Sequence, residues 1–326
     1  VVFLVPGFFG FTQAGALTYF QGVETALERA LARHGLDARI VSCRTQPTAS
    51  IRRRAERLID VVREADGLET DSLHFVGHST GGLDARLLTT PGVRLRGDRS
   101  ERLIVERTRS VITVSTPHYG TPVAGFFTTL PGRQLLEALA LLSSSRGGRL
   151  GLFGAAQAMA LAARAEELVG RRDTFIDFVA RSLLAQVTHQ TDAPLWAYLR
   201  EVARDQGAVV QLTPESMDLF NAAVVDSPEI HYASIVTAAP PPPWDLLSRD
   251  LLSVARAVLA GSFALLYAIA SREHRHYRYP HPGEQVLEAF ADGLPFPLTP
   301  RSNDGIVPAF SQVYGDVLDV VVADHL

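Results

Sequence analysis

The chain has 326 residues, 47% of them apolar, and a formal net charge of −4. Nucleic-acid binding needs a strongly basic face, and nothing in this charge calls for one, so nucleic acid is not an expected partner. The length and apolar content suffice for the core of one large α/β domain, and the single cysteine, Cys43, excludes an internal disulfide.

The cellular compartment stays open between cytoplasmic and secreted. Residues 1–5 are an apolar run without a signal-peptide pattern, and both ends look truncated. Residues 251–270 are about as long as a bilayer crossing requires, but Arg256 and Gly261 interrupt the apolar run. We therefore interpret this segment as a buried or lid helix.

In the first third of the chain, short apolar runs alternate with amphipathic stretches. Continuous apolar strands between helices are typical of a parallel sheet that is covered on both faces. The predicted strands are 1–5, 38–43, 72–76 and 110–115, and the predicted helices are Leu17–His34, Ser50–Glu64 and Thr80–Thr89.

Beyond this region the pattern is mostly helical. Helical character dominates residues 122–225, a strand is predicted at 230–238, further helix extends to about 291, and a last strand covers 317–322. We expect one domain over 1–326, with a helical cap inserted at about 122–225 and 240–295. Because both insertions follow strand ends, we interpret the cap as a lid. Its apolar helices would either touch a lipid surface transiently or pack as an ordinary bundle.

The segment Gly77-His78-Ser79-Thr80-Gly81 fits the pattern G-x-S-x-G between a predicted strand and a predicted helix. In a nucleophile elbow, a serine sits on a tight strand-to-helix turn with its hydroxyl projecting above the sheet. Glycines two residues to either side avoid crowding that turn. This context predicts that Ser79 is a nucleophile.

A nucleophilic serine needs donors for the oxyanion that forms when it attacks a carbonyl group. One expected donor is the backbone N–H of Thr80, directly after the serine. The second should come from the loop after the first strand, Pro6-Gly7-Phe8-Phe9-Gly10, where Phe8 is the best candidate. The alternative for this loop is a plain turn with aromatic residues covering the core.

The acid and the base are expected late in the chain, since such enzymes place them after the serine in the order Asp, then His. His325 follows the last strand, where parallel sheets place their sites. Asp304, in the polar turn 301–305, is the expected partner that orients the imidazole. The competing carboxylates follow it in the chain: Asp316, Asp319 and Asp324.

Taken together, these motifs resemble bacterial true triacylglycerol lipases of the Pseudomonas and Burkholderia type and their esterase relatives. The resemblance is carried by VPGFFG, VGHSTGG, TVSTPHYGTPVA, LTPESMDLFN, HYASIVT, SNDGIV and ADHL, in this order. It implies the α/β-hydrolase fold, a mobile helical lid, and a soluble bacterial enzyme that cleaves acyl esters, with a lipid as the expected substrate class.

The chain departs from this family in two respects. Its oxyanion loop has Pro6 where the family usually has histidine. This difference does not affect the mechanism, because the expected oxyanion donor is a backbone N–H. Several relatives carry a structural calcium ion near the base, with a carboxylate just beyond the histidine. The sequence ends one residue after His325, so it neither supports nor excludes calcium. No other cofactor and no stable protein partner are implied.

Other histidines have simpler interpretations. His118 is most simply a structural, hydrogen-bonded residue. His274 and His276 have the spacing of metal ligands, with His281 nearby, but no carboxylate or cysteine pattern accompanies them. A solvated loop is therefore the favoured interpretation, and no metal site is predicted.

The sequence thus predicts a serine hydrolase acting on carboxylic esters. Two alternatives remain open. One is an acyltransferase or thioesterase that uses the same Ser79, Asp304 and His325. The other is a catalytically silent, lipase-like binding protein.

Overall fold

The structure, a computed structural model, describes residues 1–8, 13–14, 17–20, 22–129, 207–242 and 263–325. Its strands include β1 Val2–Val5, β4 Ile40–Ser42, β5 Leu73–His78, β6 Thr108–Val114, β7 His231–Ala238 and β8 Asp316–Val322. Within the described residues these form one sheet in the order β4-β1-β5-β6-β7-β8, and every neighbouring pair is parallel. The predicted mainly parallel sheet is therefore confirmed.

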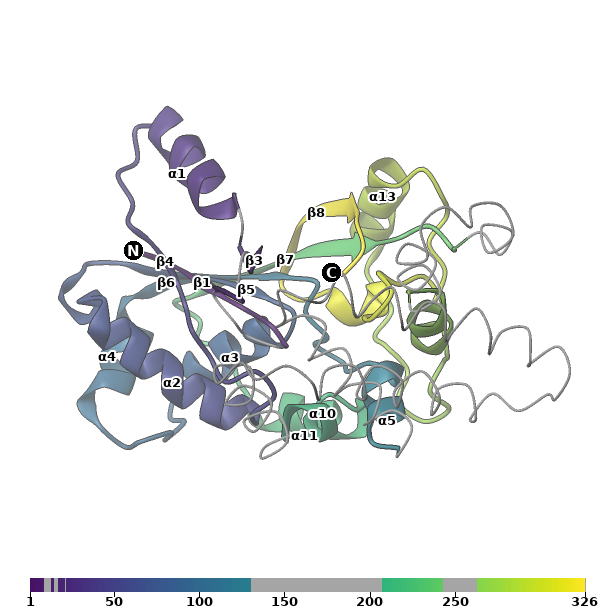
Figure 1. The fold of residues 1–326 in the computed structure, drawn as a ribbon, viewed down its shortest axis with the longest axis horizontal. Coiled ribbons are helices and arrows are strands. Elements are labelled where there is room, and N and C mark those ends of the chain that lie inside the picture. The colour runs from purple at the N-terminus through teal and green to yellow at the C-terminus, as the bar shows by residue number, and fades with distance from the viewer. Residues whose placement is uncertain (9–12, 15–16, 21, 130–206, 243–262, 326) are drawn as a thin grey trace, which may run out of the picture.

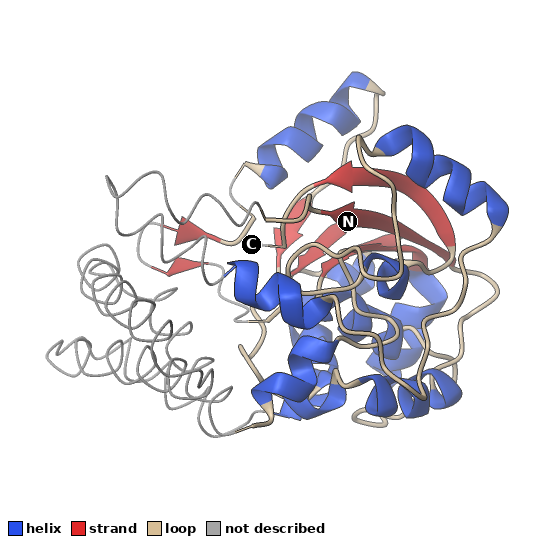
Figure 2. Ribbon diagram, turned by 90° about the vertical axis from the view of Figure 1, so that its right-hand side faces the viewer, coloured by secondary structure: helices blue, strands red, loops and turns tan. Residues whose placement is uncertain are grey.

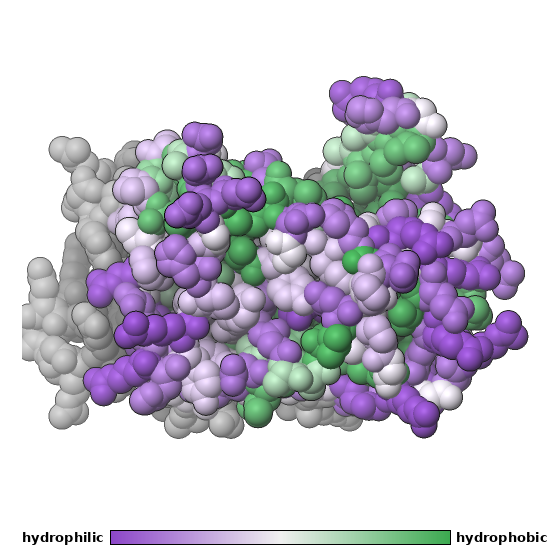
Figure 3. Space-filling view, turned by 180° about the vertical axis from the view of Figure 1, so that it is seen from behind, coloured by the Kyte–Doolittle hydropathy of each residue, from purple (hydrophilic) through white to green (hydrophobic). Residues whose placement is uncertain are grey.

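Helices cover both faces of this sheet (Figures 1 and 2). One face carries α2 Ile51–Glu64, α3 Thr80–Leu88 and α4 Arg99–Arg107, and the other carries α1 Val23–Arg33 and α13 Glu284–Gly293. Figure 3 shows hydrophobic side chains on the side of α1 that faces the body. The partly buried Leu27 and Leu31 of this helix pack against the core.

The central strands are buried on both faces because their side chains alternate between two apolar clusters. In β1, Phe3 and Val5 pack with α2, whereas Val2 and Leu4 pack toward α1. The edge strand β8 differs, since most of its residues are exposed and Val320 is its buried contact. The core thus lies around β1, β5 and β6, the strands nearest the expected nucleophile.

The predicted helix at Leu17–His34 is wrong at its start. A short antiparallel pair, β2 Gln13–Ala14 with β3 Leu17–Thr18, precedes a turn, and α1 begins only at Val23. Gly22 has a φ of 78°, a left-handed conformation that separates the turn from the helix. The helix α4 was not predicted; Asp98 caps its N-terminus by accepting the Ser100 N–H.

The two predicted cap insertions lie partly outside the described residues, which leave out 130–206 and 243–262. Around these gaps the structure describes α5 Pro122–Phe127, α10 Gly207–Gln211 and α11 Pro214–Ala223, and residues 263–270 are helical. Among the helices that the structure describes, none is long and apolar enough to span a membrane. The lid and the two-insertion cap remain predictions.

Candidate active site

Ser79 occupies the turn between β5 and α3 in a strained backbone conformation. Its φ is 54° and its ψ is −128°, a region that a residue with a side chain rarely adopts. The turn is held by two hydrogen bonds, from Ser79 N–H to the Val114 carbonyl at 2.8 Å and from Gly82 N–H to the Ser79 carbonyl at 3.1 Å. The surrounding fold therefore imposes the strained backbone geometry that is expected of a nucleophile elbow.

The glycines of the motif are required by close backbone contacts. A Cβ atom on Gly77 would lie 2.4 Å from the Gly82 nitrogen, and one on Gly81 would lie 2.3 Å from the Val5 carbonyl oxygen. Both distances are far below van der Waals contact. Larger side chains would thus displace either the turn or β1, as the sequence pattern indicates.

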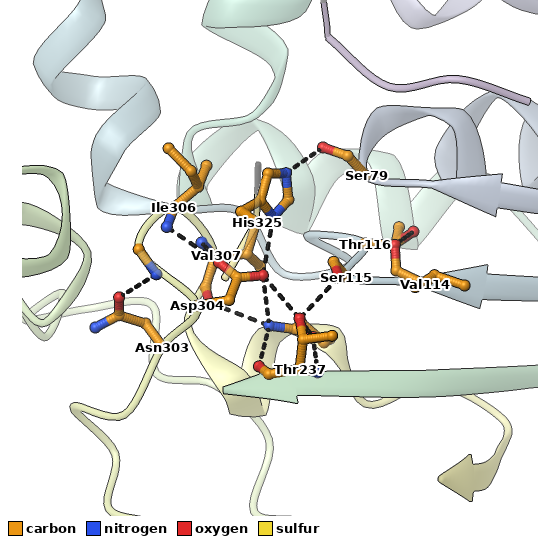
Figure 4. Close-up of polar contacts among 12 residues, drawn as sticks. Ser79, Val114, Ser115, Thr116, Thr237, Asn303, Asp304, Ile306, Val307 and His325 are labelled. Atoms are coloured by element: carbon orange, nitrogen blue, oxygen red, sulfur yellow. Dashed lines mark hydrogen bonds and ion pairs between the residues drawn. The ribbon is translucent and has the colours of Figure 1, made fainter. Parts of the chain in front are cut away.

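The structure brings Ser79, His325 and Asp304 together in one hydrogen-bonded chain (Figure 4). His325 Nε2 lies 2.9 Å from Ser79 Oγ, and His325 Nδ1 lies 2.8 Å from Asp304 Oδ2. The backbone adds a contact, because the His325 N–H donates to the Asp304 carbonyl at 2.9 Å. The order serine, imidazole, carboxylate is the arrangement that activates a hydroxyl nucleophile.

Asp304 is fully buried and its two carboxylate oxygens have separate partners. Oδ1 accepts the backbone N–H groups of Ile306 at 3.0 Å and Val307 at 2.7 Å. Oδ2 accepts from the Thr237 hydroxyl at 2.9 Å, besides its contact with His325 (Figure 4). It also accepts from the Gln312 amide at 3.2 Å. These donors fix the carboxylate so that it orients the imidazole.

The competing carboxylates lie elsewhere. Asp316 and Asp319 are exposed on β8, where Asp316 contacts His231 at 2.8 Å and Asp319 accepts the Val320 N–H. Asp324 is also exposed. Among the described residues, Asp304 is the carboxylate that contacts the His325 ring.

The loop after β1 lies directly against the elbow. A Cβ atom on Gly7 would lie 2.5 Å from Ser79 Cβ and 3.0 Å from the His78 carbonyl oxygen, so only glycine permits this approach. Arg54 of α2 fixes the loop from behind. Its Nη2 donates to the Pro6 carbonyl at 2.6 Å, and its Nε donates to Asp84 Oδ2 at 2.9 Å.

The two expected oxyanion donors flank this contact. Thr80 is fully buried. Because it is the first residue of α3, its N–H is one of the first-turn N–H groups that have no acceptor within the helix. Phe8 follows Gly7, and its side chain packs against the buried apolar cluster of α5, α10 and helix 263–270. Ile306, two residues after Asp304, packs against the same cluster, which places an apolar wall beside the polar site.

Two further histidines, His118 and His274, form hydrogen bonds within the fold. His118 is fully buried between Arg86 and Thr113, in agreement with a structural role. His274 contacts Glu215 through Nε2 at 2.9 Å and accepts backbone N–H groups at Nδ1. Among the described residues, no group of three or more His, Cys, Asp or Glu side chains could hold a metal ion.

Sequence reasoning missed three residues that shape the site. Thr237 and Gln312 hold Asp304, and Tyr19 contacts both the loop after β1 and the residue before Ser79. Thr237 could have been noticed because it lies at the carboxyl end of a strand. No pattern in the sequence singles out Gln312 or Tyr19.

Comparisons with known proteins rest on structure. No protein-family model and no curated protein matches the chain in sequence. Three solved structures are similar over 99% of this chain: EstA from Clostridium botulinum, lipase 1 from Pelosinus fermentans and the Staphylococcus hyicus lipase. Their TM-scores are 0.52, 0.54 and 0.51, their identities 18%, 16% and 17%, and the matches cover 81%, 91% and 87% of those chains, respectively.

These likenesses concern the fold. The Pseudomonas and Burkholderia subfamily remains a prediction, since these three proteins come from other genera. The parallel sheet, its helices on both faces and its lipase and esterase neighbours agree with the fold expected from the sequence. The chain has the α/β-hydrolase fold.

Proposed function

We propose that the protein is a carboxylic ester hydrolase that uses Ser79, His325 and Asp304 as a catalytic triad. The observation that carries this proposal is the hydrogen-bonded chain from Ser79 Oγ through both nitrogens of His325 to Asp304 Oδ2. Similar folds among lipases and esterases support it as an analogy of fold.

The geometry supports a two-step reaction. His325 Nε2 takes the proton of the Ser79 hydroxyl while Oγ attacks the ester carbonyl carbon. The backbone N–H groups of Phe8 and Thr80 would donate to the oxyanion. His325 then protonates the leaving alcohol, which leaves an acyl group on Ser79. Water repeats the sequence and releases the carboxylic acid.

Asp304 acts through His325. Its carboxylate accepts the Nδ1–H, holds the tautomer with a free Nε2, and stabilises the imidazolium that forms during attack. Four further donors hold this carboxylate in the orientation that faces the ring.

We propose that the acid part of the ester substrate is a hydrocarbon acyl chain. The apolar cluster that includes Val123, Phe127 and Leu266, with Phe8 and Ile306 packed against it, lies beside the proposed oxyanion donors. Such a wall favours a hydrocarbon chain over a charged group. A lipid ester is therefore the proposed substrate class.

The direct test is Ser79→Ala with p-nitrophenyl esters of increasing chain length and triglyceride emulsions as substrates. We expect hydrolysis by the wild type and a loss of about 10⁶-fold in kcat in the variant. The matched control is Ser110→Ala, since Ser110 also contacts a histidine, His74, at 2.8 Å, but has no place in the site. It should retain wild-type activity.

Three outcomes would contradict the proposal. Full esterase activity in Ser79→Ala would exclude this serine as the nucleophile. A wild-type protein that neither hydrolyses esters nor reacts with a fluorophosphonate probe would indicate a silent binding protein. Faster acyl transfer to added alcohols or thiols than to water would instead favour the acyltransferase.

A further inference from the structure

Tyr19 joins the two segments that carry the proposed reactive groups. Its hydroxyl oxygen accepts the Gly7 N–H at 2.8 Å and lies 2.6 Å from Nδ1 of His78. Gly7 precedes Phe8, the proposed oxyanion donor, and His78 precedes Ser79, the proposed nucleophile. One hydroxyl therefore contacts the neighbour of each group.

The contact occurs where packing leaves little room. A Cβ atom on Gly7 would lie 2.9 Å from the Tyr19 oxygen as well as 2.5 Å from Ser79 Cβ. The Tyr19 ring also meets the His78 ring edge to face, with centroids 5.7 Å apart. The loop, the tyrosine and the elbow thus form one packed unit.

The protonation states suit a hydroxyl donor and a neutral imidazole acceptor. Burial raises the pKa of Tyr19 to about 12, so the hydroxyl keeps its proton at neutral pH. Burial, reinforced by the neighbouring His325, lowers the pKa of His78 to about 3, although Asp304 acts in the opposite direction. The two imidazole rings lie with centroids 5.0 Å apart.

We propose that Tyr19 is a positioning residue that ties the oxyanion loop to the nucleophile elbow, accepting the Gly7 N–H and donating to His78 Nδ1. The inference rests on the proposed function, because it assigns Tyr19 a part in placing the Phe8 amide relative to Ser79. Oxyanion donors act only when they lie at hydrogen-bonding distance from the position where charge develops. A tie between loop and elbow sets that distance.

The kinetic test is Tyr19→Phe, which removes the hydroxyl and keeps the ring. We expect kcat for a p-nitrophenyl ester to fall about 10- to 100-fold with little change in KM, as for a misplaced catalytic group. The matched control is Tyr232→Phe. That hydroxyl also accepts a backbone N–H, from Ser227 at 3.3 Å, and contacts a side chain, Thr89, at 3.2 Å.

A double-mutant cycle with His78→Leu tests the contact from its other side. If the two residues act as one unit, His78→Leu should also lower kcat, and the double variant should lose little more than either single variant. A wild-type kcat in Tyr19→Phe, a loss equal to that of Tyr232→Phe, or fully additive losses would overturn the proposal.

A nuclear magnetic resonance measurement decides the contact independently of activity. In ¹⁵N spectra of the wild type, His78 should be neutral, with Nδ1 unprotonated and the proton on Nε2. In Tyr19→Phe, the His78 Nδ1 signal should shift and the Gly7 amide should exchange faster with solvent. A protonated Nδ1 in the wild type, or unchanged Gly7 exchange in the variant, would overturn the proposal. An inactive wild type with the expected spectra would instead contradict the proposed function.

Discussion

The carboxylate of Asp304 shows how one residue is prepared by its surroundings. It lies in a tight turn whose own backbone N–H groups, from Ile306 and Val307, donate to Oδ1. Thr237 and Gln312 reach the other oxygen from β7 and from η3 Ala309–Gln312. The side chain is thereby held for His325, while carboxylates of the same type on β8 remain in solvent.

Asp304→Asn should lower kcat about 10⁴-fold with little change in KM, because an amide cannot hold the required His325 tautomer. Steady-state kinetics with a soluble ester measure this change, and circular dichroism checks the fold. The matched control is Asp316→Asn, which alters an exposed Asp–His pair with the same 2.8 Å contact. Equal activity in the two variants would exclude Asp304 as the acid of the triad.

At the scale of elements, a buried ion pair joins α2, α3 and the loop after β1. Arg54 and Asp84 are both fully buried, and Arg54 also donates to the carbonyl groups of Gln46 and Pro6. Each element alone would leave a charge or a carbonyl group without a partner. The pair therefore fixes how α3, the helix that follows Ser79, lies against the loop after β1.

Asp84→Asn should lower the free energy of unfolding by about 3–5 kcal/mol, since it leaves the Arg54 charge buried without its partner. Urea unfolding measures the loss. Asp60→Asn is the matched control, because Asp60 pairs with Arg96 at the surface. Its loss should stay below about 1 kcal/mol. A similarly small loss in Asp84→Asn would show that the buried pair adds no net stability.

At the scale of the whole molecule, a polar network around Arg86 connects segments far apart in the chain. Arg86 of α3 donates to His118 Nδ1 at 3.1 Å, to the Asn221 side chain at 3.2 Å and to the Tyr314 hydroxyl at 2.7 Å. The Tyr314 hydroxyl donates to Asp226, which brings a carboxylate near the buried cation. The network thus connects α3 to the segments that precede β7 and β8.

Within this network His118 must be neutral. Arg86 can only donate, so Nδ1 accepts, and Nε2 donates to Thr113, whose hydroxyl is bonded to the Ala233 carbonyl. Burial, with Arg86 as the second cause, lowers the pKa of His118 well below its usual value. The unfolded chain takes up this proton below about pH 6.5, whereas the folded chain does not.

The free energy of unfolding should therefore fall as the pH is lowered from about 6.5 toward acid. In His118→Gln, whose amide keeps one donor and one acceptor, this decline should be shallower. Urea unfolding between pH 7 and pH 5 measures both slopes. His281→Gln at an exposed position should keep the wild-type slope. If His118→Gln keeps the wild-type dependence of unfolding free energy on pH, the His118 ring takes up its proton equally in the folded and unfolded chain.

The sequence by itself determined the features that depend on local geometry. The alternation of apolar runs and helices predicted the parallel sheet, and the glycines around Ser79 predicted the turn, because close backbone contacts leave no room for side chains there. Chain order pointed to Asp304 and His325. These inferences needed only neighbouring residues and the general form of the fold.

Only the tertiary structure decided which distant groups meet. The bonds from Thr237 and Gln312 to Asp304, and from Tyr19 to Gly7 and His78, join residues separated by up to 67 positions in the chain. The segment around Tyr19 was predicted to be helical, yet it forms a turn that brings its hydroxyl to the site. Such contacts follow from how the strands are ordered and packed, which no local pattern encodes.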